Sequence, residues 1–211
     1  MININIEGDA WGNNISIPQG TQESKNLFEE ISSSLIRIQG SKYSFRNENG
    51  KNDALRNSLL DKGFCINDQM RNGRSGSKNE VNFDCGELDI VICDCENNSE
   101  IISIVEALEL DSLGEKNKIV KSHINKLLYS YDTAGNNENF LVIYSMVKKF
   151  DRLWEKYKQH INNVIFPDEV DLFEIETSKS DIRGGYNYYL RNGKKLKLSH
   201  LFVNMYKGGG C

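Results

Sequence analysis

The stretch GELDIVICDCENNSEIISIVEALEL, residues 86–110, contains two apolar runs separated by a polar turn. The first run is short and the second is rich in β-branched residues, as expected of buried strands. The polar segment ENNSE between them predicts that the two strands pair antiparallel. Asp89 stands at the head of the first run and Glu106 near the end of the second, so we expect both acids far from the turn, side by side.

The flanking segments predict a mixed sheet with helices on both faces. The spacing of apolar residues predicts helices over residues 21–38, 52–63, 115–132 and 147–161, and strands over residues 64–71, 87–94, 101–110 and 139–146. Three strands joined by hairpins are thus followed by a crossover helix and a fourth strand. We therefore expect an α/β fold with the order helix, strand, strand, strand, helix, strand.

The pattern changes after Pro167, where two alternating runs flank the pair Asn192-Gly193. That pair between alternating runs predicts a β-hairpin with a type I′ turn. We expect four parts along the chain: an N-terminal helical extension (1–46), a core (47–166), a C-terminal strand-rich appendage (167–207) and a flexible tail (208–211).

The composition is typical of a folded protein, since 38% of the 211 residues are apolar and 27% are charged. No apolar run approaches the ~20 residues that span a bilayer, and the N-terminus lacks the features of a signal peptide. A cytoplasmic protein without membrane contact is therefore expected. We expect the five cysteines to be reduced, because no CxxC or paired His/Cys spacing indicates a metal site.

The charges are unevenly distributed along the chain. Residues 80–115 contain eleven acids and no Lys or Arg, whereas residues 179–207 contain seven basic residues and one acid. Such a chain could hold a cation at one place and a polyanion next to it, although solvated surfaces would give the same counts. Two adjacent carboxylates without a basic neighbour favour a divalent cation, so Asp89 and Glu106 are candidate ligands of Mg²⁺ or Mn²⁺.

These features resemble the core of the PD-(D/E)XK phosphodiesterase superfamily, which includes restriction endonucleases and Holliday-junction resolvases. Its signature is an acid on the second core strand and Glu-x-Lys on the third, often with a Glu in the first core helix. Asp89 in GELD matches the first acid, Glu106 in EAL the second, and Glu48 the helix acid. The resemblance covers about residues 47–145. It implies a restriction-endonuclease-like αβββαβ core, with Glu48 as a third ligand or a water-positioning acid.

Leu108 departs from the signature, because it stands where the motif has its lysine. In one interpretation the chain is a metal-dependent endonuclease for DNA, with RNA as second choice, whose cation has moved to Lys118 or Lys121, or whose lysine is replaced by Gln69. In the other, catalysis is lost and the domain recruits a nucleic acid or a partner protein. Degenerate members of the superfamily suggest an effector of phage defence or of a mobile element.

Basic residues in two places are candidate contacts to nucleic acid. Arg71 and Arg74 lie in a Gly/Ser-rich connection, while Lys194 and Lys195 lie in the C-terminal hairpin close to tyrosines. Lysine and arginine suit phosphates and aromatic faces suit bases, whereas an ordinary solvated loop and hairpin are the alternatives. A homodimer also stays open, since many such nucleases cut two strands by pairing subunits.

Overall fold

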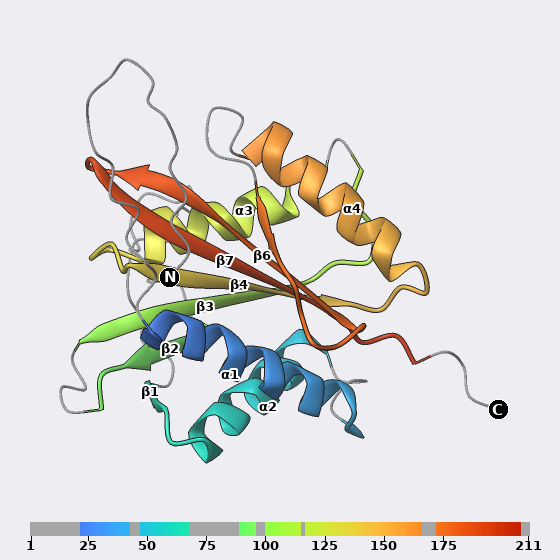
Figure 1. The fold of residues 1–211 in the computed structure, drawn as a ribbon, viewed down its shortest axis with the longest axis horizontal. Coiled ribbons are helices and arrows are strands. Elements are labelled where there is room, and N and C mark those ends of the chain that lie inside the picture. Colours follow the sequence, from blue (N-terminus) through green and yellow to red (C-terminus); the bar gives the residue numbers. More distant parts are fainter. Residues whose placement is uncertain are drawn as a thin grey trace, which may run out of the picture.

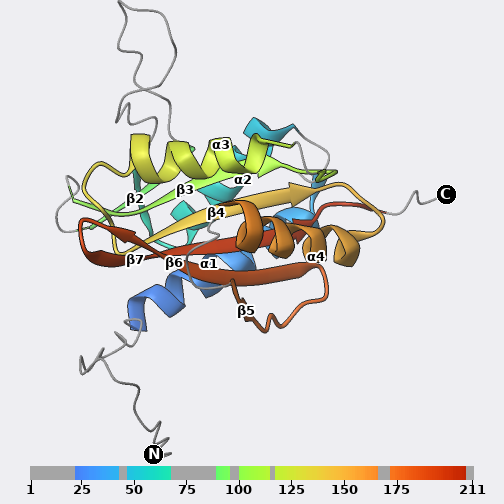
Figure 2. The ribbon, with the colours of Figure 1, turned by 90° about the horizontal axis from the view of Figure 1, so that it is seen from above.

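The described residues form one seven-stranded sheet between two layers of helices (Figure 1, Figure 2). The computed structural model describes residues 22–42, 47–67, 89–95, 100–114, 117–165 and 172–207. The helices are α1 (Gln22–Gln39), α2 (Glu48–Asp61), α3 (Ile119–Asn125) and α4 (Phe150–His160), and the π-helical turns η2 (Lys126–Tyr131) and η3 (Ile161–Ile165) extend the last two. The strands are β1 (Cys65–Asn67), β2 (Ile90–Cys93), β3 (Ile101–Glu109), β4 (Glu138–Ser145), β5 (Phe173–Ile175), β6 (Ile182–Arg191) and β7 (Lys194–Asn204).

The strand order in the sheet is β1-β2-β3-β4-β7-β6-β5. Strands β1, β2 and β3 form an antiparallel meander, and α3 carries the chain over to β4, which lies parallel to β3. This succession of α2, three strands, α3 and β4 confirms the predicted order of elements. The chain is therefore an α/β protein with a mixed sheet flanked by helices.

The apolar residues of the central strands divide between the two helical layers. On one face Ile90 and Val105 pack with α1 and α2, and on the other Val91 and Leu108 pack with α3 and α4. Strands β3 and β4 are buried along most of their length, which explains their nearly continuous apolar sequences. In the register of β2 and β3, Ile90 lies opposite Val105, so the preceding Asp89 comes beside Glu106.

Helix α2 begins where the sequence provides a cap. The Asn47 side chain accepts a hydrogen bond from the Gly50 backbone N–H at 3.1 Å, which satisfies one of the free donors of the first turn. The helix ends at Asp61, and Gly63, two residues further on, has a φ of 86°, which favours glycine. Glu48 therefore occupies the first turn of α2, because the helix begins four residues before the predicted start at residue 52.

The C-terminal hairpin is confirmed, because Asn192 and Gly193 have φ angles of 51° and 78° between β6 and β7. Strand β7 pairs in parallel with β4 along the whole of β4, so the hairpin continues the main sheet. Both core clusters accordingly include β7 residues, Phe202 in one and Leu201 in the other. The boundaries of the four proposed parts stay a prediction.

The expectation of reduced cysteines is wrong for two of the five. A disulfide joins Cys65 on β1 to Cys95, two residues beyond the end of β2, across a Cα–Cα distance of 5.3 Å. The antiparallel pairing of β1 with β2 brings the two segments together, which spacing within either segment does not reveal. Cys93 is a buried free thiol. Disulfides are more typical of oxidising environments than of the cytoplasm. The cytoplasmic location stays a prediction.

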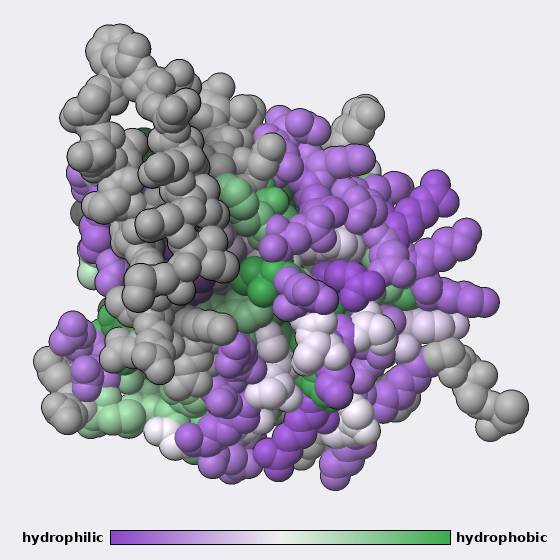
Figure 3. Space-filling model, viewed as in Figure 1, coloured by the Kyte–Doolittle hydropathy of each residue, from purple (hydrophilic) through white to green (hydrophobic). Residues whose placement is uncertain are grey.

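The coloured surface in Figure 3 is mostly hydrophilic, with hydrophobic residues showing in smaller patches between hydrophilic ones. Within the described residues no helix combines the length and the apolar character that crossing a membrane requires.

Gly184 on β6 provides a test of how closely α1 packs on the sheet. A Cβ atom at this position would lie 2.5 Å from Cζ of the buried Phe28 on α1. We expect Gly184→Ala to destabilise the fold by about 1–3 kcal/mol, since overpacking displaces the ring. Denaturant unfolding measures this, with Gly114→Ala as the control, because nothing lies within 4 Å of the Cβ there. Equal stability of the two variants would contradict the packing described.

Candidate active site

Three acids predicted from the sequence come together at the carboxyl end of β3. Glu48 lies in the first turn of α2, Asp89 directly precedes β2, and Glu106 lies on β3. Their proximity is evident in the pKa of Asp89, which burial raises to about 7, with further contributions from the charges of Glu106 and Glu48. Burial and the two neighbouring acids therefore all disfavour ionisation of Asp89.

Asp89 is held by hydrogen bonds to both carboxylate oxygens. Its Oδ2 accepts from the Ala107 backbone N–H at 2.7 Å, and its Oδ1 accepts from Nδ2 of Asn52 on α2 at 3.1 Å. Asn52 in turn accepts from the hydroxyl of Tyr144 on β4 at 3.0 Å. Since an ionised carboxylate can accept about four hydrogen bonds, each oxygen of Asp89 keeps capacity for a further ligand.

Glu106 is held from the opposite side of the sheet. Its side chain is almost fully buried, and Oε1 lies 2.7 Å from Nδ1 of His123 on α3. The next residue but one, Leu108, points into the same layer and is completely buried against α3 and α4. Leu108 thus serves core packing, while His123 has a polar contact to one of the acids.

The cation at this site comes from α2. Nζ of Lys51 lies 2.5 Å from Oε1 of Glu109, the last residue of β3, and the Lys51 side chain is nearly inaccessible to solvent. Glu48 contacts the same strand end, because its Oε2 accepts from the Glu109 backbone N–H at 2.9 Å. The Glu109 side chain is 41% exposed, so this buried lysine reaches a group that faces solvent.

Lys51, Asn52 and Tyr144 were not predicted from the sequence as site residues. A signal was present for the first two, since they follow Glu48 by three and four residues and therefore share its helix face. For Tyr144 there was none, because a tyrosine in an apolar strand indicates only burial. His123 was not predicted from the sequence as a site residue either, although it contacts Glu106.

The lysines proposed to replace Leu108 lie outside the acid cluster. Lys118 lies just before α3 and Lys121 lies on it, and both side chains are exposed. The pKa of His160 is lowered mainly by burial and in addition by the charge of Lys121. Among the described residues, no hydrogen bond or ion pair joins either lysine to Glu48, Asp89 or Glu106. Gln69, Arg71 and Arg74 lie outside the described residues.

Lys194 and Lys195 lie at the opposite end of the sheet from the acids, at the start of β7. The Lys197–Glu138 register places this part of β7 beside the start of β4, whereas Tyr144 is near the end of β4. Six residues of extended strand separate Glu138 from Tyr144, which corresponds to about 20 Å. These lysines therefore cannot take part in chemistry at the acids, but they could contact a long ligand.

The donors at the site fit a hard divalent cation in kind. Carboxylate oxygens are the ligands that Mg²⁺ and Mn²⁺ prefer, and a cation beside Asp89 would offset the charges of Glu106 and Glu48, which add to the effect of burial on its pKa. Within the described residues, however, no three His, Cys, Asp or Glu side chains stand ready as a complete metal site. A cation would therefore complete its coordination with water.

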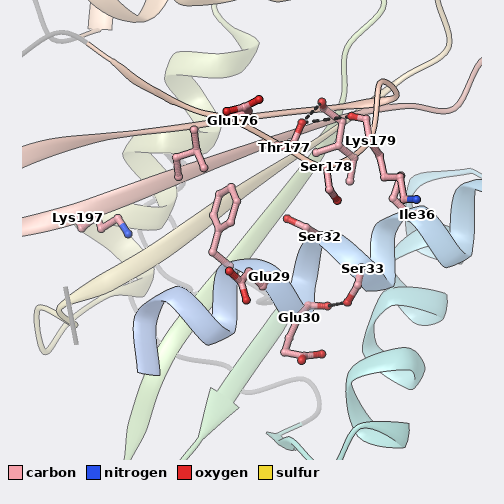
Figure 4. A pocket seen from close by; sticks show the side chains of 13 residues that line it. Glu29, Glu30, Ser32, Ser33, Ile36, Glu176, Thr177, Ser178, Lys179 and Lys197 are labelled. Atoms are coloured by element: carbon pink, nitrogen blue, oxygen red, sulfur yellow. Dashed lines mark hydrogen bonds between the residues drawn. The ribbon is translucent and has the colours of Figure 1, made fainter. Parts of the chain in front are cut away.

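A separate hollow of about 860 Å³ lies between α1 and the β5–β6 connection (Figure 4). Glu29 and Ser33 of α1 line one side, and Thr177 and Lys179 line the other. The Thr177 hydroxyl closes the connection by donating to the Ile182 carbonyl at 2.7 Å. None of the acids at the end of β3 lines this hollow, so it is distinct from the candidate site.

The fold and the acids together define an α/β protein with an acidic site at one end of its sheet. Comparison of the chain with models of known families, with curated proteins and with solved structures finds no match.

The raised pKa of Asp89 predicts a pH-dependent stability. Because the folded pKa of about 7 exceeds the ordinary 3.8, the folded state binds this proton more tightly than the unfolded state. The resulting stabilisation is complete below about pH 4 and is lost as the pH rises to about 7. Asp89→Asn removes the ionisation, so we expect its stability relative to wild type to improve by roughly 2–4 kcal/mol between pH 4 and pH 8.

Denaturant unfolding with a chelator present measures this difference. Asp61→Asn is the matched control, since its side chain at the end of α2 is 65% exposed. The same pH dependence in both variants would show that burial among acids is not what raises the pKa of Asp89.

Proposed function

We propose that the chain is a metal-dependent phosphodiesterase that cuts nucleic acid, with DNA as the preferred substrate. The observation that carries the proposal is the convergence of Glu48, Asp89 and Glu106, with its effect on the pKa of Asp89. A divalent cation bound there would supply a Lewis acid for a phosphoryl oxygen and lower the pKa of an attacking water. The protein's part is to hold the carboxylates and to bring a cation close to the developing charge.

The order of elements supports this proposal. The acids lie on the first helix, the second strand and the third strand of the αβββαβ succession, as in the PD-(D/E)XK superfamily that the sequence resembles. Fold alone does not define an activity, so the weight rests on the acids themselves.

Lys51 is the proposed replacement for the motif lysine. It reaches the end of β3 from α2, where its ammonium contacts Glu109 three residues beyond Glu106. A cation near the carboxylates can stabilise the charge that develops on phosphorus oxygens, and its position in the sequence matters less than its place in space. The exposed Lys118 and Lys121 lack this proximity.

The C-terminal hairpin supplies a surface suited to a nucleic acid strand. Phe173 on the neighbouring β5 stacks with Tyr186 of the hairpin with ring centroids 5.3 Å apart, and the exposed Lys195 lies 4.5 Å over the Tyr188 ring. Aromatic rings that stack on bases and lysines that contact phosphates are the two elements of single-strand binding. Its distance from the acids favours a polymer over a small molecule as substrate.

Removal of either central acid tests the activity. We expect Asp89→Ala and Glu106→Ala to reduce cleavage of plasmid or oligonucleotide DNA in Mg²⁺ or Mn²⁺ by more than about 100-fold, the upper range for residues that merely support metal ligands. Asp111→Ala is the control, because this acid at the same end of the sheet binds the Met146 backbone N–H instead. Equal cleavage by wild type and both acid variants would defeat the proposal.

Replacement of Lys51 tests the proposed cation. We expect Lys51→Met to lower the cleavage rate by about 10²–10³-fold, the loss typical of one stabilising donor. Its stability should change little, since Met keeps the packing and the partly exposed Glu109 stays hydrated. Lys118→Met and Lys121→Met are matched controls. Loss of cleavage in either of those variants, with activity retained in Lys51→Met, would return the role to α3.

A non-catalytic binding module is the second candidate. The features that favour it are Leu108, which belongs to the core, and Glu106, which is already engaged by His123. Such a module would bind nucleic acid or a partner protein and would not bind Mg²⁺ or Mn²⁺ near Asp89. Calorimetric titration of the wild-type chain with either ion separates the two candidates.

A further inference from the structure

A buried chain of hydrogen bonds crosses from β4 to Asp89. The Tyr144 hydroxyl donates to Oδ1 of Asn52 at 3.0 Å, and Nδ2 of Asn52 donates to Oδ1 of Asp89 at 3.1 Å. Tyr144 is completely buried and Asn52 is 7% exposed, so water does not compete for these bonds. These hydrogen bonds connect α2 and β4 to the carboxylate of Asp89, which directly precedes β2.

The order of donors along this chain is fixed by chemistry. An amide has one acceptor oxygen and one donor nitrogen, so the Tyr144 hydroxyl, by donating to the oxygen of Asn52, leaves the nitrogen to face Asp89. The pKa of Tyr144 is raised well above its ordinary value by burial and by the charges of Asp89, Glu48 and Glu109. The hydroxyl therefore keeps its proton and remains a donor.

The chain also fixes the rotation of the Asp89 carboxylate. Asn52 holds Oδ1 from the α2 side, while the Ala107 backbone N–H holds Oδ2 from β3 at 2.7 Å. Rotation about the bond to the carboxyl group would break both contacts. The remaining lone pairs thus point in defined directions, which is the condition for a ligand prepared in advance of its cation.

We infer that Tyr144 and Asn52 are positioning residues, which orient the Asp89 carboxylate to receive a divalent cation. The inference rests on the proposed function and identifies how one ligand of that site is held. Neither residue touches the cation or the substrate in this account. Their effect passes through Asp89 alone, so it should appear in the affinity for the metal before any substrate is present.

A second buried chain of the same kind provides a matched comparison. The Tyr157 hydroxyl lies 2.7 Å from Nδ1 of His200, and Nε2 of His200 lies 2.6 Å from Oδ1 of Asn187. Burial lowers the pKa of His200 to about 3, so the neutral ring donates to Asn187 and accepts from Tyr157. This chain lies in the other helical layer and ends on no acid.

The experiment is calorimetric titration with Mn²⁺ alone of the full chain as wild type, Tyr144→Phe and Tyr157→Phe. Each variant loses one buried hydroxyl and keeps its ring, including in Tyr144→Phe the ring that lies 5.6 Å from Nζ of Lys51. We expect Tyr144→Phe to weaken Mn²⁺ binding about 10–100-fold, the usual effect of removing an outer support of a ligand. Tyr157→Phe should bind as wild type does.

Asn52→Leu is a second variant, which removes the direct contact to Asp89 and should weaken binding at least as much as Tyr144→Phe. Wild-type binding with unchanged affinity in Tyr144→Phe and Asn52→Leu would overturn this inference and leave the proposed function standing. Equal weakening in Tyr157→Phe would also overturn it, because the loss would then follow general destabilisation. Absence of Mn²⁺ binding by the wild type would overturn the proposed function together with it.

Discussion

The antiparallel register of β2 and β3 is the constraint on which the candidate site depends. Ile90 opposite Val105 divides the apolar residues between two helical layers, and a shift of β2 by one residue would turn each of its side chains toward the other layer and away from its packing partners. The same register brings Asp89 beside Glu106. The burial of apolar side chains therefore holds two acids together, although their mutual repulsion opposes it.

That repulsion is reduced by contacts from both layers. Asn52 and the Ala107 backbone bind Asp89, whereas His123 binds Glu106 from the other face of the sheet. Lys51 and its partner Glu109 add a nearby ion pair at the strand end. Ionisation of Asp89 is unfavourable in the folded state, where its pKa is about 7, and acids with strongly raised pKa values are common at functional sites.

Local patterns in the sequence predicted much of this arrangement. Alternation and helical spacing were sufficient for the order of elements, for the type I′ turn at Asn192 and for the pairing of the strands that carry Asp89 and Glu106. Contacts between distant elements were not predictable in this way. The Cys65–Cys95 disulfide depends on the register of two strands.

The position of the buried Lys51 was also not predicted from local sequence patterns. The sequence offered Lys118, Lys121 and Gln69 as replacements for the motif lysine, whereas the buried Lys51 lies 57 positions before Leu108, on α2. Leu108 itself packs in the core, because the face of β3 on which it lies is covered by α3 and α4. A position in a motif therefore indicates a place in the sheet, and a basic side chain close to that place can come from another element.

The pairing of β7 with β4 has a consequence for any shortened form of the chain. Without β7, the backbone N–H and C=O groups along one side of β4 would have no partner, and the apolar Leu141 and Val142 would lose neighbours on opposite faces. An open, flat and apolar edge of this kind invites strands of other molecules. A fragment ending before β7 would therefore be prone to aggregate.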